Sequence, residues 1–245
     1  MKRNIFGVMI DDIDRRCLTE EISKRLSLNV RTVIFTPNPI MVQNAKKDGD
    51  FMKILNAADY NIPDGNGIVL ASRLLKSPIK ERICGIDLAE ELLETLAKKE
   101  LKLFLYGGRE GVAELAAKKL RGRYPNLQIC GYINGFAPPD TALKRIKQSS
   151  PDVIYVCLGS PKQERWIYEN MTALDGTKLF IGLGGSLDVW SGMVTRAPKC
   201  ARKIGMEWLW RMASSPKKLK DFPKLVAFGA SAVAKRLFVV GIMHR

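Results

Sequence analysis

Five loops of this sequence combine glycines with polar side chains, and each follows a short aliphatic run typical of a β-strand. They span Thr36–Pro39, Pro63–Gly67, Tyr106–Gly111, Leu158–Glu164 and Gly182–Asp188. Glycine leaves the backbone N–H groups accessible, and a helix that starts after such a turn favours negative charge at its N-terminus. The loops therefore indicate a site for a nucleotide or a diphosphate. The candidate binding residues are Gly107, Gly108, Gly159, Gly184, Gly185 and Asp188.

Five polar side chains of the strand-to-helix region could act on such a ligand. Asp64 could be a base, or an ordinary turn residue and helix cap. Thr36 and Asn38 could hydrogen-bond a sugar, or either could simply cap the helix that begins near Pro39. Arg82 could orient a phosphate and Gln163 a polar substrate, although exposed Arg and Gln side chains usually contact only water. The residue types alone leave both interpretations open.

Other chemistries are disfavoured by what the sequence lacks. The only histidine is His244, which argues against Ser-His-Asp catalysis and His-rich metal sites. No G-x-x-x-x-G-K-[ST] motif is present, and the glycine loop at 106–111 is not a complete dinucleotide fingerprint. Asp11, Asp12 and Asp14 form a D-x-D pattern that could hold a metal, but a solvated turn is the more ordinary interpretation. The five cysteines are scattered and odd in number, which favours reduced thiols in the cytosol.

The elements that must position these loops alternate along the chain. The alternation predicts an α/β fold with a Rossmann-like, largely parallel sheet and flanking helices, most regular over residues 101–190. Strands are expected at Ile5–Ile10, Thr32–Thr36, Tyr60–Pro63, Lys102–Tyr106, Leu127–Tyr132, Val153–Leu158 and Lys178–Leu183. Helices are expected at Glu20–Leu26, Ile40–Lys47, Gly67–Leu75, Leu88–Lys98, Gly111–Arg121, Thr141–Lys147 and Lys162–Asn170. In such sheets, ligands bind beyond the carboxyl ends of the strands.

The last fifty residues form a basic segment that differs in composition from the rest. Residues 196–245 hold twelve Lys and Arg against two acidic residues, within a chain of net charge +15. We therefore expect a catalytic domain at 1–195 and a basic helical appendage at 196–245. The apolar run Leu225–Met243 contains Lys235 and Arg236, so lying in the membrane interface costs less free energy than spanning the bilayer. The aromatic residues that could anchor it are Trp208, Trp210, Phe222, Phe228 and Phe238.

Two other classes of protein share parts of this pattern. A nucleic-acid-binding protein fits the isoelectric point near 9.7, but the appendage lacks a base-reading motif and its apolar half favours lipid. A nicotinamide-dependent oxidoreductase fits the Rossmann-like half. We expect an anionic membrane surface and no nucleic acid as partner. The apolar appendage also leaves a surface through which the chain could form a homo-oligomer.

Taken together in order, the loops and several other segments resemble the WecG/TagA/CpsF family of glycosyltransferases, glycosyltransferase family 26. The other matching segments are Phe6–Val8, Ala58–Gly67, Glu81–Asp87, Leu105–Gly108, Gly131–Gly135, Arg196–Pro198 and Glu207–Arg211. Within the family the chain is most similar to the TagA group of wall teichoic acid synthesis.

The resemblance implies a reaction and roles for particular residues. It implies transfer of N-acetylmannosamine from UDP-N-acetylmannosamine to undecaprenyl-diphosphate-linked N-acetylglucosamine, with a β-1,4 linkage and inversion. The alternative within the family is a mannosaminuronic acid donor. Asp64 matches the proposed base, Thr36 and Asn38 would position sugars, and Arg82 and Gln163 would hold the diphosphate and donor. No metal or other cofactor is implied.

The resemblance also gives the appendage a second role. It suggests that this segment can cover the active site and lend it basic side chains, with the enzyme attached peripherally to the cytoplasmic face of the membrane. Arg211 is the best-matched candidate. Lys217 and Lys218 stand where family members usually carry arginines.

Overall fold

The protein is described by a computed structural model, which covers residues 1–198, 201, 207, 209–210 and 216–243. Its centre is a six-stranded, all-parallel sheet in the order β4-β3-β8-β7-β5-β6. The strands are β3 (Thr32–Phe35), β4 (Tyr60–Asn61), β5 (Leu103–Gly107), β6 (Ile129–Ile133), β7 (Val153–Cys157) and β8 (Leu179–Gly182). The four central strands are buried on both faces, as their continuous aliphatic sequences require. The predicted α/β fold with a parallel sheet is confirmed.

One expected strand, Ile5–Ile10, is wrong. The segment forms a separate antiparallel hairpin of β1 (Lys2–Ile5) and β2 (Val8–Asp11). Phe6 and Gly7 both have positive φ, at 53° and 95°, and the Gly7 N–H is bound by the side chain of Asn4 at 2.8 Å. This two-residue turn reverses the chain in the middle of an otherwise strand-like run.

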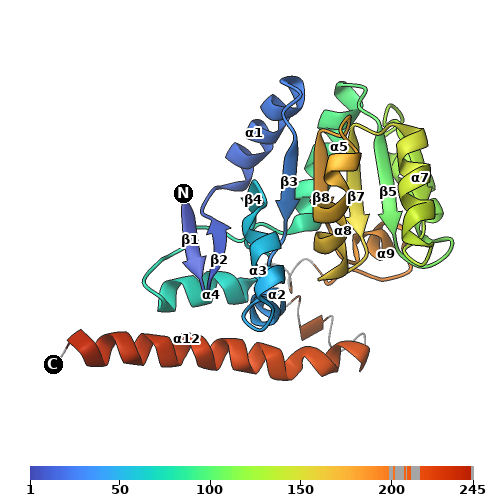
Figure 1. Cartoon of the computed structure of the whole chain (residues 1–245). Coiled ribbons are helices and arrows are strands. Elements are labelled where there is room, and N and C mark those ends of the chain that lie inside the picture. Colours follow the sequence, from blue (N-terminus) through green and yellow to red (C-terminus); the bar gives the residue numbers. More distant parts are fainter. Residues whose placement is uncertain (199–200, 202–206, 208, 211–215, 244–245) are drawn as a thin grey trace.

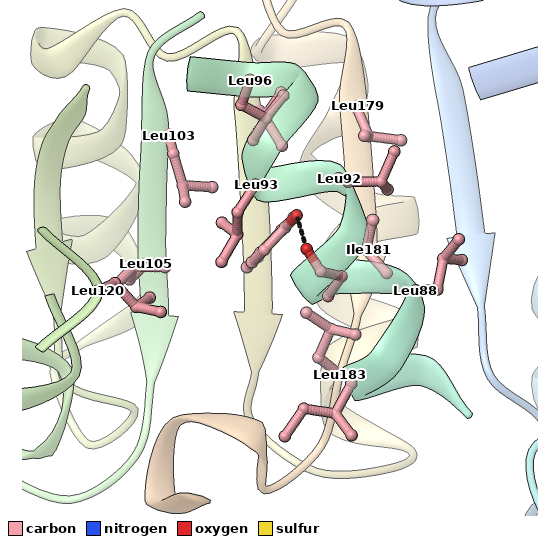
Figure 2. Close-up of a cluster of buried hydrophobic side chains, with 14 of the residues drawn as sticks. Leu88, Leu92, Leu93, Leu96, Leu103, Leu105, Leu120, Leu179, Ile181 and Leu183 are labelled. Carbon is pink, nitrogen blue, oxygen red and sulfur yellow. Dashed lines mark hydrogen bonds between the residues drawn. The ribbon is translucent and has the colours of Figure 1, made fainter. Parts of the chain in front are cut away.

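One face of the sheet is covered by α1 (Arg15–Ser27), α5 (Gly85–Lys98) and α6 (Val112–Arg123). Helix α5 presents a leucine-rich side to the strands (Figure 2). Leu92, Leu93 and Leu96 lie there against Leu103 and Leu179, all without solvent exposure. Beneath α5, the Tyr155 hydroxyl donates to the carbonyl of Ala89 at 3.0 Å, so the one polar atom of this buried ring is satisfied. Packing on this face fixes the position at which α5 starts, beside the loop that carries Arg82.

The opposite face is covered by α2 (Pro39–Ala45), α3 (Gly49–Asn56), α7 (Pro139–Ser149) and α8 (Lys162–Asn170), with α4 (Asn66–Leu74) against β1. Helix α3 was not among the expected elements; Asp48 caps it by accepting the Phe51 N–H at 3.0 Å. The short helix α9 (Ser186–Trp190) after β8 was not expected either, and the 3-10 turn η1 (Met171–Ala173) follows α8.

The described end of the chain consists of a 3-10 turn, η2 (Pro216–Asp221), and the long helix α12 (Phe222–Met243). Helix α12 contacts α2 and α4, and in Figure 1 it crosses the molecule on the side to which the strand arrows point. Phe228 is buried against these helices, and its ring meets that of Phe6 edge-on at 5.6 Å. Lys46, at the C-cap of α2, donates to the Ser231 hydroxyl at 3.2 Å. Within the described residues, no helix combines the length and the apolar character needed to cross a membrane.

Candidate active site

The loops at the carboxyl ends of β3 and β4 are joined by backbone hydrogen bonds. The Asp64 N–H donates to the Pro37 carbonyl at 3.0 Å, and the Ile83 N–H donates to the Pro63 carbonyl at 3.1 Å. The loop holding Thr36 and Asn38, the loop holding Asp64 and the segment holding Arg82 therefore form one contiguous layer. This is the edge of a parallel sheet at which ligands bind.

Asp64 is half-buried and ends the loop that leads into α4. The residue at the N-cap position of α4 is Gly65, at φ 106°, and Asp64 directly precedes it. The negative charge of Asp64 adds to the pKa of the nearby Cys84 thiol, which burial raises to about 12. The thiol stays protonated at neutral pH, so Asp64 is a better candidate for a catalytic base than Cys84.

Asn38 caps α2. Its side-chain oxygen accepts the N–H groups of Ile40 and Met41, both at 3.0 Å, and Pro39 occupies the first helical turn. The capping interpretation is confirmed for the amide oxygen. This bonding fixes the side chain at the start of a helix, next to Pro37 and the Asp64 backbone.

Thr36 and Gln163 both bind the end of β8. The Thr36 hydroxyl donates to the Gly182 carbonyl at 3.1 Å, and the Gly184 N–H donates to the Gln163 side-chain oxygen at 2.8 Å. Thr36 is 6% exposed and Gln163 is 2% exposed. The two side chains thus hold the turn after β8 from β3 on one side and from α8 on the other.

Glu164 completes this arrangement, and sequence reasoning missed it. Its carboxyl group accepts the Gln163 side-chain N–H at 2.7 Å and is fully buried. Burial raises the pKa of Glu164, with the hydrogen bond from Gln163 acting in the opposite direction. No signal in the sequence Pro-Lys-Gln-Glu distinguishes a buried Glu from one that faces water.

The glycine turns follow three adjacent strands at the middle of the sheet. Gly107 ends β5, Gly108 follows it, Gly159 follows β7, and Gly184 and Gly185 follow β8. Gly107 has φ 135°, and a Cβ atom there would overlap the carbonyl of Cys157. Only glycine allows β5 and β7 to approach this closely. Asp188 lies in the first turn of α9, and its backbone carbonyl accepts the Ser191 hydroxyl at 3.0 Å.

Arg82 lies beside charged residues from distant parts of the chain. Its guanidinium contacts the Glu207 carboxylate at 3.3 Å, and the Arg196 guanidinium lies 3.7 Å from the other oxygen of that carboxylate. Arg196 also binds both oxygens of Asp87, at 2.6 and 2.9 Å, and approaches the Cys84 sulfur at 3.5 Å. Arg82 therefore meets a protein carboxylate and not only water. The sequence segments around Arg196 and Glu207 contributed to the resemblance, but nothing in them indicated this pairing.

The remaining candidates fall into two groups. Arg211 lies outside the described residues, and for Lys217 and Lys218 only the backbone, within η2, is described. The D-x-D residues serve the fold: Asp14 caps α1 through the Cys17 N–H, and Asp12 pairs with Arg3 at 3.0 Å.

Asp11 differs from the expected solvated turn. It is 7% exposed and accepts the Asn61 N–H at 2.8 Å, and burial raises its pKa. The carboxylate joins β2 to β4 and lies 3.7 Å from the Lys2 ammonium group. The part of the chain that the structure describes contains no group of three or more His, Cys, Asp or Glu suited to a metal ion.

A cavity of about 580 Å³ lies between α1 and α5 and is lined mostly by charged side chains such as Arg15, Glu91 and Lys98. Asp14 of the D-x-D pattern lines it, but none of the candidate catalytic or nucleotide-sugar-binding residues does. The converging loops, and not this cavity, carry the groups able to act on a substrate.

Comparison with known proteins gives one consistent result. The sequence profile described as "Glycosyl transferase WecG/TagA/CpsF family" matches residues 3–239. A protein of Bacillus subtilis (strain 168) is 38% identical over 199 residues, which cover 80% of this chain and 77% of that protein. A protein of Staphylococcus aureus (strain MW2) is 37% identical over 231 residues, covering 91% of this chain and 89% of that protein. Both relatives are named N-acetylglucosaminyldiphosphoundecaprenol N-acetyl-beta-D-mannosaminyltransferase.

Proposed function

The chain belongs to the WecG/TagA/CpsF family of glycosyltransferases, and from this premise we propose that it transfers N-acetylmannosamine from UDP-N-acetylmannosamine to undecaprenyl-diphosphate-linked N-acetylglucosamine. The product linkage is β-1,4, and the step commits the acceptor to the linkage unit of wall teichoic acid. The names of the two relatives support this choice of sugar and acceptor. The observation that carries the proposal is the layer in which Thr36, Asn38, Asp64 and Arg82 meet at the carboxyl edge of the sheet.

Asp64 is the general base of the proposed reaction. An acceptor hydroxyl attacks the anomeric carbon of the donor, Asp64 takes its proton, and the bond from that carbon to the UDP oxygen breaks with the electron pair leaving on UDP. Attack from the face opposite the leaving group inverts the anomeric configuration. The loop of Asp64 is held by its backbone hydrogen bond to the Pro37 carbonyl, so the carboxylate starts from a defined position.

The developing charge on UDP requires cations or backbone N–H donors. Arg82 is the proposed cation of the catalytic domain. Glycines 107, 108, 159, 184 and 185 and Asp188 surround the proposed nucleotide-sugar position. Thr36 and Gln163 act through the turn after β8, which they hold by hydrogen bonds. Asn38 contributes to the same edge from the start of α2. The resemblance implies no metal, so these groups and Arg211, Lys217 and Lys218 of the appendage meet the charge.

The appendage, residues 196–245, attaches the catalytic domain, residues 1–195, to an anionic membrane in this proposal. Several exposed side chains of α12 are apolar: Phe222, Val226, Val233 and Leu237 are each about half exposed or more. Lys220, Lys224, Lys235 and Arg236 flank them. Basic side chains near an anionic surface contribute about 1 kcal/mol each. The enzyme would then work peripherally at the cytoplasmic face, where a polyprenyl-linked acceptor presents its sugar.

The donor sugar is tested by a direct competition. Full-length protein is assayed with a lipid-diphosphate-N-acetylglucosamine acceptor and either UDP-N-acetylmannosamine or its uronic acid counterpart. Transfer from the first donor alone supports the proposal. Transfer from the uronic acid donor alone would keep the family and overturn the sugar assignment.

Binding measurements at physiological salt distinguish a membrane partner from a nucleic-acid partner. We expect retention on anionic phospholipid vesicles and none on duplex DNA. The same apolar face of α12 could pair two copies of the chain when no membrane is present. Light scattering with and without vesicles or detergent would then show a homo-oligomer that dissociates as the face is covered.

A further inference from the structure

Four charged side chains form a continuous chain of ion pairs between the catalytic domain and the appendage. Asp87 binds Arg196, Arg196 faces Glu207, and Glu207 contacts Arg82. Their side chains are largely shielded, with exposed fractions of 27, 15, 9 and 16% in that order. Ion pairs removed from water to this degree depend on their geometry, because losing one partner leaves the other charge poorly solvated.

Glu207 is the bridging member of the chain. Its two carboxylate oxygens face different arginines, one toward Arg196 at 3.7 Å and the other toward Arg82 at 3.3 Å. Arg196 is itself held by both oxygens of Asp87, at the first turn of α5. Arg196 therefore provides a fixed support for Glu207, and Glu207 in turn fixes one side of the Arg82 guanidinium.

The bridge lies at the proposed site. Arg82 directly precedes Ile83, whose N–H binds the carbonyl next to Asp64. Cys84 follows, and after its burial the charges that raise its pKa come from Asp64, Glu207 and Asp87. The Cys84 thiol thus lies close enough to both the proposed base and the Glu207 carboxylate for each to raise its pKa, which places Glu207 near the reacting groups.

We propose that Glu207 is a positioning residue that orients Arg82 toward the leaving diphosphate, and that the appendage thereby controls Arg82 when it docks. This inference rests on the proposed function. It assigns the appendage an action through a residue of the catalytic domain, distinct from any basic side chain that it lends to the site. The alternative role for Glu207 is that of an internal anion that competes with the substrate diphosphate for Arg82.

The test is steady-state kinetics of the full-length chain with UDP-N-acetylmannosamine and a detergent-dispersed lipid-diphosphate acceptor, together with calorimetric UDP binding. Glu207→Gln keeps the size of the side chain and removes its charge. We expect kcat to fall about tenfold or more while the Kd for UDP changes by less than about threefold. Glu207→Asp should recover part of kcat. Asp221→Asn is the matched control, because Asp221 is the other acidic residue of the appendage and pairs with Lys224.

A double-mutant cycle separates positioning from simple anchoring. In an Arg82→Ala background, Glu207→Gln should change kcat by less than about twofold, because the group through which it acts is gone. Multiplicative losses would show that Glu207 only anchors the appendage, and tighter UDP binding by Glu207→Gln would show a competing anion. Either result overturns the inference.

The readouts also separate the inference from the proposed function. Wild-type protein without UDP-sugar transferase activity would overturn the proposed function. Wild-type activity with a Glu207→Gln variant of full kcat would overturn the inference alone. If Glu207→Gln does not fold, as judged by thermal unfolding, the cycle is run with Glu207→Asp.

Discussion

The Gly184 N–H donates a 2.8 Å hydrogen bond to the side-chain oxygen of Gln163, across the junction of β8 and α8. The nitrogen of the same amide donates to Glu164, so both ends of a 2% exposed side chain are bound within the protein. A residue expected to face the donor is thus a brace for the glycine turn that the donor is proposed to contact. Its influence on catalysis would pass through that turn.

Replacing Gln163 by Ala should lower stability and activity together. The substitution removes the partner of the Gly184 N–H and one of the hydrogen bonds of the buried Glu164 carboxyl, which costs about 1–3 kcal/mol for a buried polar group. Urea unfolding measures the loss, with Lys162→Ala as the exposed neighbour that should be neutral. Full stability with lost turnover would instead show that Gln163 binds substrate directly.

Glu164→Gln should change how stability depends on pH. Burial raises the pKa of Glu164 above its unfolded value of about 4.3, so the folded state keeps a proton that the unfolded state releases. Wild-type stability therefore falls as pH rises from about 4.3 to the folded pKa, and levels off above it. Because the Glu164→Gln variant cannot lose this proton, it should be more stable than wild type at pH 7. The difference between their free energies of unfolding should be smaller near pH 4. Urea unfolding across this range checks the sign, and parallel curves for the two proteins would contradict it.

Gly107→Ala should be strongly destabilising. The added methyl group meets the Cys157 carbonyl, and the backbone has a positive φ that alanine disfavours. We expect a loss on the order of 3 kcal/mol, read as a lower midpoint of thermal or urea unfolding. Gly122→Ala in α6 is the control, since nothing lies within 4 Å of its added Cβ, and it should be neutral or slightly stabilising.

Asp64→Asn should nearly abolish transfer while leaving UDP affinity intact. The amide keeps the size of the side chain but cannot accept a proton, and general bases contribute about 10²–10⁴-fold to rate. Turnover is measured with the lipid-linked acceptor, and UDP binding by calorimetry. A variant with full activity would remove Asp64 from the mechanism.

Val233→Asp should weaken membrane binding without changing the fold. Val233 is 49% exposed on α12, so a charge there costs little in solution but must be desolvated at a bilayer. Co-sedimentation with anionic vesicles should show several-fold weaker binding than wild type. Leu28→Asp at the end of α1 introduces the same charge at another exposed apolar position and should bind normally. Equal binding of both variants and wild type would exclude this face as the contact.

Local sequence patterns predicted the elements well, because alternating aliphatic runs and helical segments carry their own periodicity. They failed at Phe6 and Gly7, where a turn interrupts a run that is apolar throughout. The loop residues were found because glycine and polar side chains concentrate at strand ends. Their partners were not: Arg82 and Glu207 are 125 positions apart, and no local pattern pairs residues at that distance.

The sequence also did not indicate in which direction these side chains point. Thr36 and Gln163 could have faced a sugar or the protein interior, and only the position of β8 decides for the interior. Nothing within the sequence of either loop specifies that strand as its neighbour. The site was therefore predictable as a set of loops, but not as a set of contacts.

The order of strands has a consequence for how the chain is made. β3 and β4 form one edge of the sheet and β5 and β6 the other, and they are joined only through β7 and β8, which are synthesised last. β5 lacks its inner partner until β7 (Val153–Cys157) has been made, and until β8 (Leu179–Gly182) has been made β3 and β7 each expose a strand that is buried in the finished sheet. A nascent chain that ends before β8 would thus depend on protection from aggregation, and completion of the fold would follow release of the final central strand.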